Sequence, residues 1–194
     1  ANKATYPTES MLAASLAIIA RLIAGGLQTR VYMVKLGGFD THANQLTRHA
    51  ELLKELSEAI TAFTEDLQQL GVINRVVGMT YSEFGRRVRE NGGGTDHGTA
   101  SAHFVFGGMV AGGAIHGGLP NFSDLAGGAN LRHAINFPCY YASVIGPLFS
   151  IPQHQLGDIF PLGLCDTLIP LYNQQQTGVQ EYPSQEIPKA IDLQ

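Results

Sequence analysis

Residues 75–108 read RVVGMTYSEFGRRVRENGGGTDHGTASAHFVFGG, and this stretch decides the fold that the sequence predicts. Two apolar runs, at 76–81 and 103–106, are rich in β-branched and aromatic residues, a composition typical of buried strands. Between them a glycine run leads into Asp96 and His97. Acidic and imidazole groups where buried strands end are typical of α/β functional sites, so this stretch is the first candidate site.

A second polar loop lies upstream, after the strand-like segment Thr29 to Leu36. Gly37 and Gly38 allow a sharp turn at the end of that segment, and Asp40 and His42 follow. Between the two loops, apolar residues recur at three- and four-residue steps and predict one long helix that ends at Gly71. Its stripe comprises Leu46, His49, Leu53, Leu56, Ile60, Phe63, Leu67 and Leu70. A strand, a helix and a strand at this spacing predict a βαβ unit, hence a parallel sheet with a right-handed crossover.

The flanking segments predict further helices and weaker strands. A helix capped by Thr8 or Ser10 should end at Gly25–Gly26. After Gly108 the pattern suggests a short hairpin over 110–116, an edge strand over 131–137, a helix over 139–149 and a short helix after Pro152. The predicted domain covers 1–161, and 162–194, rich in proline and glutamine, is predicted to be an extended tail.

Composition limits the class of protein. The 194 residues form one domain or a large piece of one, with 44% hydrophobic and 14% charged residues. A net charge of -4 gives no reason to expect nucleic acid or an anionic membrane as a partner. The run Met11 to Leu27 is interrupted by Arg21 and is too short to span a membrane. Cys139 and Cys165 are predicted to be two buried thiols, with one bridge in an oxidising compartment as the alternative.

The two loops supply candidate metal ligands. Asp40 and His42 stand one residue apart, and a divalent cation accepts a carboxylate oxygen together with a neutral imidazole. The alternative is a helix-capping aspartate beside a surface histidine. Asp96 is either a further ligand or the carboxylate that orients His97, and glycines on both sides of that pair allow close backbone approach. A flexible surface loop is the alternative there.

Three more residues belong to the candidate site. Glu83 follows the strand predicted at 74–81 and is either a ligand or the partner of a salt bridge to Arg86 or Arg87. These arginines can hold a phosphate or sulfate group, because a guanidinium forks onto such oxygens. The alternative is a pair of solvated arginines beside an acid.

Three motifs in this order resemble a known family: GGFDTHANQ at 37–45, TYSEFGRR at 80–87 and GTDHGTA at 94–100, with the long helix after the first. They resemble the DUF1501 family of uncharacterised bacterial proteins, over roughly residues 6–161. That family is similar to the alkaline phosphatase and sulfatase superfamily. The resemblance implies a three-layer α/β/α sandwich with a mostly parallel sheet and a metal site at the carboxyl ends of its strands.

The resemblance also implies roles for single residues. Asp40 matches an aspartate ligand, and His42 substitutes for the histidine expected at Asn44. Glu83 matches the aspartate of an Asp-His pair whose histidine is replaced by Phe84. His97 matches the last histidine ligand. A rival alignment equates Asp96 and His97 with the Asp-His pair itself.

In the superfamily the nucleophile lies in an amino-terminal half. This chain is therefore expected to be the carboxy-terminal part of a longer protein, with the missing half as a partner. The implied function is metal-dependent hydrolysis of a small anionic phosphate or sulfate ester, or the ligand-bearing part of such a hydrolase. The implied metal is zinc first, then calcium, magnesium or manganese, and the implied location is periplasmic or extracytoplasmic. The alternative is a non-catalytic structural or binding module that keeps the fold.

Overall fold

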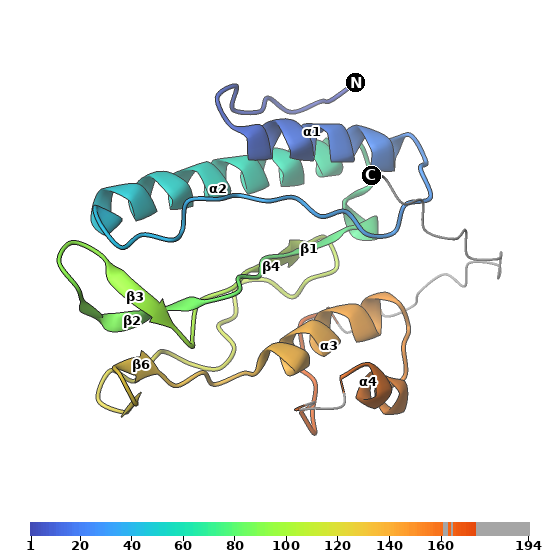
Figure 1. Ribbon diagram of the computed structural model, residues 1–194. Coiled ribbons are helices and arrows are strands. Elements are labelled where there is room, and N and C mark those ends of the chain that lie inside the picture. The colour runs from blue at the N-terminus through green and yellow to red at the C-terminus, as the bar shows by residue number, and fades with distance from the viewer. Residues whose placement is uncertain (161–162, 164, 174–194) are drawn as a thin grey trace, which may run out of the picture.

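The computed structural model describes residues 1–160, 163 and 165–173 (Figure 1). Two helices that run side by side in the same direction cover one side of the molecule, short strands occupy its middle, and two further helices lie on the other side. The elements in chain order are α1 (Met11–Ala24), α2 (Gln45–Gln69), a 3₁₀ turn η1 (Ile73–Arg75), β1 (Val77–Met79), β2 (Gly85–Glu90), β3 (Thr95–Gly98), β4 (Val105–Gly107), β5 (Leu125–Ala126), β6 (Asn130–Leu131), α3 (Phe137–Leu148) and α4 (Gln153–Ile159).

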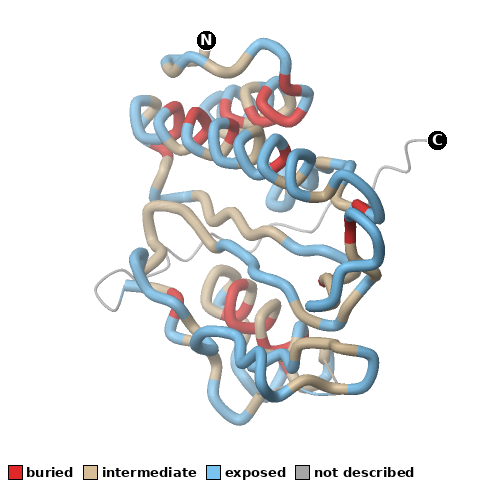
Figure 2. Tube along the Cα trace, turned by 90° about the vertical axis from the view of Figure 1, so that its left-hand side faces the viewer, coloured by how far each residue is buried: buried red, intermediate tan, exposed pale blue. Residues whose placement is uncertain are grey.

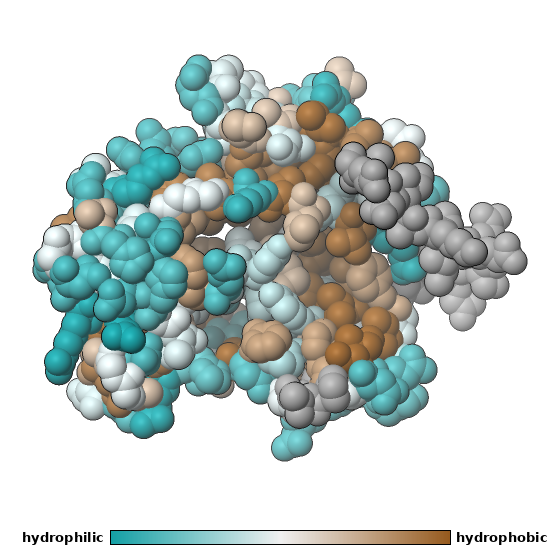
Figure 3. Space-filling view, viewed as in Figure 1, coloured by the Kyte–Doolittle hydropathy of each residue, from teal (hydrophilic) through white to brown (hydrophobic). Residues whose placement is uncertain are grey.

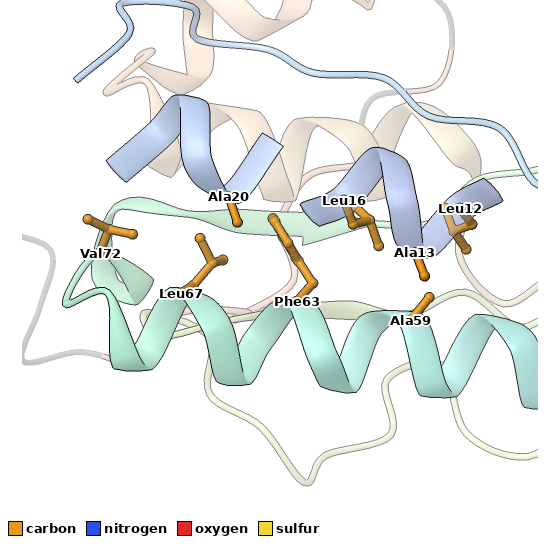
Figure 4. Close-up of a cluster of buried hydrophobic side chains, with 8 residues drawn as sticks. All are labelled: Leu12, Ala13, Leu16, Ala20, Ala59, Phe63, Leu67 and Val72. Atoms are coloured by element: carbon orange, nitrogen blue, oxygen red, sulfur yellow. The ribbon is translucent and has the colours of Figure 1, made fainter. Parts of the chain in front are cut away.

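The first two helices confirm their sequence patterns. Ser10 caps α1, because its hydroxyl accepts a hydrogen bond from the Ala13 amide, and Gly26 takes up a positive φ of 81° just after the helix. The second half of the predicted stripe on α2 packs against α1 and forms the main core (Figure 4). In the first half the prediction is wrong, because Leu46 and Leu53 are exposed and Leu52 is buried instead. The buried members of this core are Leu12, Ala13, Leu16, Ala20, Ala59, Phe63, Leu67 and Val72. Alanines at Ala13 and Ala59 let the two helices approach closely.

A buried carboxylate ties the amino-terminal residues to α2. Asp66 is fully buried and accepts hydrogen bonds from the Asn2 side chain, the Lys3 and Ala4 amides and the Tyr6 hydroxyl, at 2.6–3.1 Å. Burial alone would raise the pKa of Asp66, but these donors together lower it below its ordinary value. The first residues are therefore held on the helix as an ordered strap.

The predicted parallel α/β/α sandwich is wrong. Within the described residues, the strands form small two-stranded antiparallel sheets that pair β1 with β4, β2 with β3, and β5 with β6. The partner of β1 arrives only after the chain has run out and back through the β2–β3 hairpin. Because the chain has reversed by then, Val77 faces Gly107 in an antiparallel register. The apolar run at 76–81 thus contributes a three-residue strand and no βαβ crossover.

The strand predicted at Thr29 to Leu36 is also wrong. The segment pairs with no strand in the part of the chain that the structure describes, and its outward residues Val31 and Met33 are 71% and 77% exposed. Leu36 packs against the α1–α2 core. The strand-like composition therefore gives an extended connection along the core, because no backbone among the described residues completes a ladder with it.

The second half of the chain forms a smaller packed unit around α3 (Figure 2). The predicted helix over 139–149 is confirmed with its start moved to Phe137, where Asn136 caps it, and the helix after Pro152 is α4. The hairpin predicted over 110–116 is absent from the described structure, where Val110 instead forms a bridge to Tyr172. The strand predicted over 131–137 is reduced to β6, because Phe137 already belongs to α3.

Cys139 and Cys165 form a disulfide, so the prediction of two thiols is wrong and the alternative bridge is correct. Sequence spacing alone cannot show that residues 165–173 return to α3. There the Ile169 amide donates to the Ser143 hydroxyl, and the Tyr172 hydroxyl donates to the Val144 carbonyl. Most of the predicted tail, 174–194, lies outside the described residues. Among the helices that are described, none combines the length and apolarity needed to cross a membrane.

Candidate metal centre

The loop before α2 is fastened to the β2–β3 hairpin, and this contact builds the site. The first amide of α2, that of Gln45, donates to the Gly93 carbonyl at 2.9 Å, and the Thr95 hydroxyl donates to the Gln45 side chain at 2.9 Å. Gly94 lies so close to the loop that an added Cβ would stand 2.3 Å from the His42 carbonyl carbon. Glycine is needed at Gly94 for this close approach.

Asp40, His42 and His97 converge at this junction. Oδ1 of Asp40 lies 2.7 Å from Nε2 of His97 and 2.9 Å from Nε2 of His42. One ligand atom from each residue falls within 4.8 Å of the others. The loop after the extended segment and the β3 strand, predicted to meet, are thus brought together although the parallel sheet that motivated the prediction is absent.

The electrostatics keep the carboxylate charged. The hydrogen bond from His97 lowers the pKa of Asp40 below its ordinary value; slight burial opposes this, and the charges of His97, His42 and Arg86 add to it. An anionic oxygen shared by two imidazole nitrogens is a donor set that suits a divalent cation. The three side chains are 59%, 48% and 46% exposed for Asp40, His42 and His97, so the centre is open to solvent.

Asp96 stands behind His42. Its Oδ1 lies 3.7 Å from Nδ1 of His42 and accepts a hydrogen bond from the Asn91 side chain at 2.7 Å. Its other oxygen lies 3.6 Å from Nη1 of Arg87. Asp96 thus faces His42 at a distance too long for a hydrogen bond, and the carboxylate that contacts His97 is that of Asp40.

The two arginines serve different faces of the β2–β3 hairpin. Successive residues of a strand point to opposite sides. Arg86 donates to the Thr41 hydroxyl at 2.9 Å, and its Nη1 lies 3.7 Å from Asp40. Nε and Nη1 of Arg86 are buried and have no hydrogen-bond partner among the described residues. Arg87 instead lies near Asp96 and the backbone of Gly128.

Glu83 is not part of the cluster. It is exposed, and within the described part of the chain it makes no ion pair with Arg86 or Arg87, so the structure supports neither interpretation of this residue. His49, on the inner face of α2, packs edge-on against Phe39 with its ring centroid 5.8 Å away. Its predicted packing role agrees with this contact.

Two residues that support the candidate site were not predicted from the sequence. Thr41 is buried and links Arg86 to the loop, and Phe84 stacks on His97. Thr41 lies between two candidate ligands, and buried loop residues at such positions have no sequence pattern. Figure 3 shows hydrophilic residues gathered over the β2–β3 hairpin, while hydrophobic residues gather on the opposite side of this face. The polar junction thus lies away from the apolar side of the molecule.

Comparison with known proteins identifies the family and no activity. A family model described as "Protein of unknown function (DUF1501)" matches residues 2–131, which include all three motifs and the whole candidate centre. No curated protein and no solved structure matches the chain. The chain belongs to the DUF1501 family.

Proposed function

We propose that this DUF1501 protein binds a divalent metal ion through Asp40, His42 and His97 and serves in the hydrolysis of phosphate or sulfate esters, alone or as the ligand-bearing part of the hydrolase. The observation that carries the proposal is the convergence of three ligand atoms within 4.8 Å. Asp40 and His97 are 57 residues apart in sequence, and specific backbone and side-chain contacts hold their segments together.

The donor set favours zinc. Two imidazoles and one carboxylate are typical of catalytic zinc sites, which keep a further position for water or substrate, and the same set suits non-haem iron(II). Calcium and magnesium prefer ligand sets made wholly of oxygen, so the two histidines disfavour these ions. Manganese remains an outcome for the experiment to distinguish.

The chain's own residues supply the anion contact and the ligand geometry. A bound metal would polarise an ester oxygen and make a bound water more acidic. Arg86 lies beside Asp40, and its Nε and Nη1 have no hydrogen-bond partner among the described residues, so the guanidinium has N–H groups to offer a phosphate or sulfate oxygen. Asp96 places a negative charge 3.7 Å from Nδ1 of His42, on the side away from Asp40.

The first test is the metal content of the purified chain, by elemental mass spectrometry, followed by titration of the chelator-treated protein with Zn²⁺, Mn²⁺ and Fe²⁺. We expect one metal per chain, lost in Asp40→Ala and in His97→Ala and retained in Glu83→Ala. Glu83→Ala is the matched control, because Glu83 comes from the same polar loops but lies outside the cluster. Absence of stoichiometric binding by the wild-type chain would refute the proposal.

A screen of the metal-loaded chain against p-nitrophenyl phosphate and p-nitrophenyl sulfate then separates catalysis from binding. A second candidate function is a non-catalytic binding module. The solvent exposure of the three ligands favours it, because an exposed site excludes little water. Stoichiometric metal with no turnover of either ester, by this chain or by the longest form isolated from cells, would support that module.

The location is proposed to be extracytoplasmic, in the periplasm. The Cys139–Cys165 disulfide supports this, since disulfides persist in oxidising compartments. Alkylation of free thiols in intact cells tests it. We expect both cysteines to resist alkylation in the native host, because they are paired in the disulfide. Full alkylation of both cysteines would contradict an oxidising location.

A further inference from the structure

Phe84 and His97 form a face-to-face stack beside the candidate metal centre. Their ring centroids are 3.8 Å apart and their planes are inclined by only 6°. The hairpin register explains the contact: Gly85 pairs with Gly98, and Arg86 pairs with His97, so Phe84 lies diagonally across from His97. The two strands approach each other closely beside the stack, because a Cβ on Gly98 would stand 2.5 Å from the Arg86 backbone.

The stack restricts the orientation of an exposed imidazole. The terminal torsion of a histidine is broad, so a side chain that is 46% exposed would otherwise turn freely. With one face against Phe84, the ring keeps an edge toward Asp40, and Nε2 lies 2.7 Å from Oδ1. Flat contact thus selects the orientation in which His97 offers its nitrogen to the cluster.

The two histidines of the cluster are steadied by different means. Nδ1 of His42 faces the negative charge of the Asp96 carboxylate at 3.7 Å. Nδ1 of His97 has no hydrogen-bond partner among the residues that the structure describes, and Phe84 lies against the ring instead. The guanidinium of Arg86 lies 5.5 Å from the Phe84 ring centroid and helps to hold that ring.

We infer that Phe84 is a positioning residue that orients His97 for metal binding in place of a hydrogen bond to Nδ1. The inference rests on the proposed function. Phe84, which stands where the resemblance places the histidine of an Asp-His pair, thus supports the histidine of the opposite strand. Loss of an outer partner of a ligating histidine typically weakens metal binding 10- to 100-fold.

Three variants test the inference: Phe84→Leu removes the flat face, Phe84→Tyr keeps it, and Phe104→Leu removes another exposed phenylalanine as the control. Zinc affinity is measured by competition with a chromophoric chelator. We expect Phe84→Leu to bind zinc roughly tenfold more weakly, with Phe84→Tyr and Phe104→Leu unchanged. Circular dichroism checks folding, and Phe84→Met replaces Phe84→Leu if the latter does not fold.

A second measurement needs no metal. In the metal-free wild type, the ring current of Phe84 should shift the His97 imidazole proton resonances upfield, and the shift should vanish in Phe84→Leu and persist in Phe84→Tyr. Wild-type zinc affinity in Phe84→Leu, or unchanged His97 resonances in that variant, would overturn the inference. Failure of the wild type to bind Zn²⁺, Mn²⁺ or Fe²⁺ would overturn the proposed function instead, and the imidazole resonances would still decide whether Phe84 orients the ring.

Discussion

At the residue scale, two adjacent arginines have different contacts, because successive side chains of a strand point to opposite faces. Arg86 reaches the loop of Asp40 and Thr41, whereas Arg87 reaches Asp96 on the other side. We predict that Arg86→Lys weakens binding of inorganic phosphate to the metal-loaded chain about tenfold, because an ammonium cannot fork onto two oxygens. Arg87→Lys, the matched control, should change it less than about twofold, measured by calorimetry. Equal losses in both variants would remove the distinction between the two faces.

Asp66 gives a stability prediction with a defined pH dependence. Its pKa is lowered in the folded state, so its stabilising contribution is complete above the unfolded pKa of about 4 and is lost as the pH falls through the lowered folded value. We expect Asp66→Asn to cost on the order of 3 kcal/mol at pH 7, since a buried acceptor of four hydrogen bonds loses its charge.

Urea unfolding of both proteins from pH 7 down to pH 3 measures this contribution. The difference in unfolding free energy between wild type and Asp66→Asn should shrink toward the acid end. Glu65→Gln, at an exposed neighbouring position of α2, is the control and should leave the free energy unchanged at every pH. A constant difference for Asp66→Asn across this range would mean that the charge of the carboxylate does not stabilise the strap.

Whether the sequence could identify a residue of the candidate site depended on whether its side chain carries a metal-binding group. Asp40, His42 and His97 were recognisable because few side chains bind metals and these stand beside glycines. Glu83 satisfied the same criterion, yet it lies outside the cluster, since the direction of a side chain at a strand end depends on register. Phe84 and Thr41 carry no metal-binding group, so their supporting roles emerge only from contacts across the hairpin.

At the element scale, the site depends on how closely the β2–β3 hairpin approaches the start of α2. Gly94 is buried at that contact, where a Cβ would clash with backbone atoms of Thr41 and His42. We predict that Gly94→Ala separates the two segments and weakens zinc binding at least about tenfold, because ligand geometry depends on its supporting shell. Gly112→Ala, where a Cβ would meet no atom within 4 Å, is the control. Retained zinc affinity in Gly94→Ala would show that the loop adjusts without the ligands moving.

The positions of the helices were predictable, whereas the pairing of the strands was not, for a physical reason. The hydrogen bonds of α2 join residues four apart, so its apolar period is sufficient to locate it from residue 45 to 69. A strand needs a partner that the local sequence does not specify. The segment 29–36 has strand composition but no partner in the described structure, and β1 found an antiparallel partner in β4 rather than the parallel one expected.

At the scale of the whole molecule, two packed units flank the short strands: the α1–α2 core and the α3–α4 unit (Figure 2). The second unit is held by contacts that the sequence pattern did not predict. Residues 165–173 return along α3, and the Leu171 carbonyl accepts a hydrogen bond from the Ala111 amide. The candidate metal centre lies where the loop before α2 meets the β2–β3 hairpin, and none of its three residues belongs to the α1–α2 core.

The disulfide is therefore expected to control the stability of the second unit. Closing a loop with 26 residues of sequence separation restricts the unfolded chain and contributes about 3 kcal/mol. We predict that reduction, or the double variant Cys139→Ser/Cys165→Ser, lowers the melting temperature by about 10 °C. The double variant should be indifferent to dithiothreitol, which controls for effects of the reagent. Zinc affinity should remain at the wild-type value, because the ligands belong to the α2 loop and β3. Simultaneous loss of zinc binding and of the folded α3–α4 unit would instead show that this unit and the α1–α2 core fold as one cooperative structure.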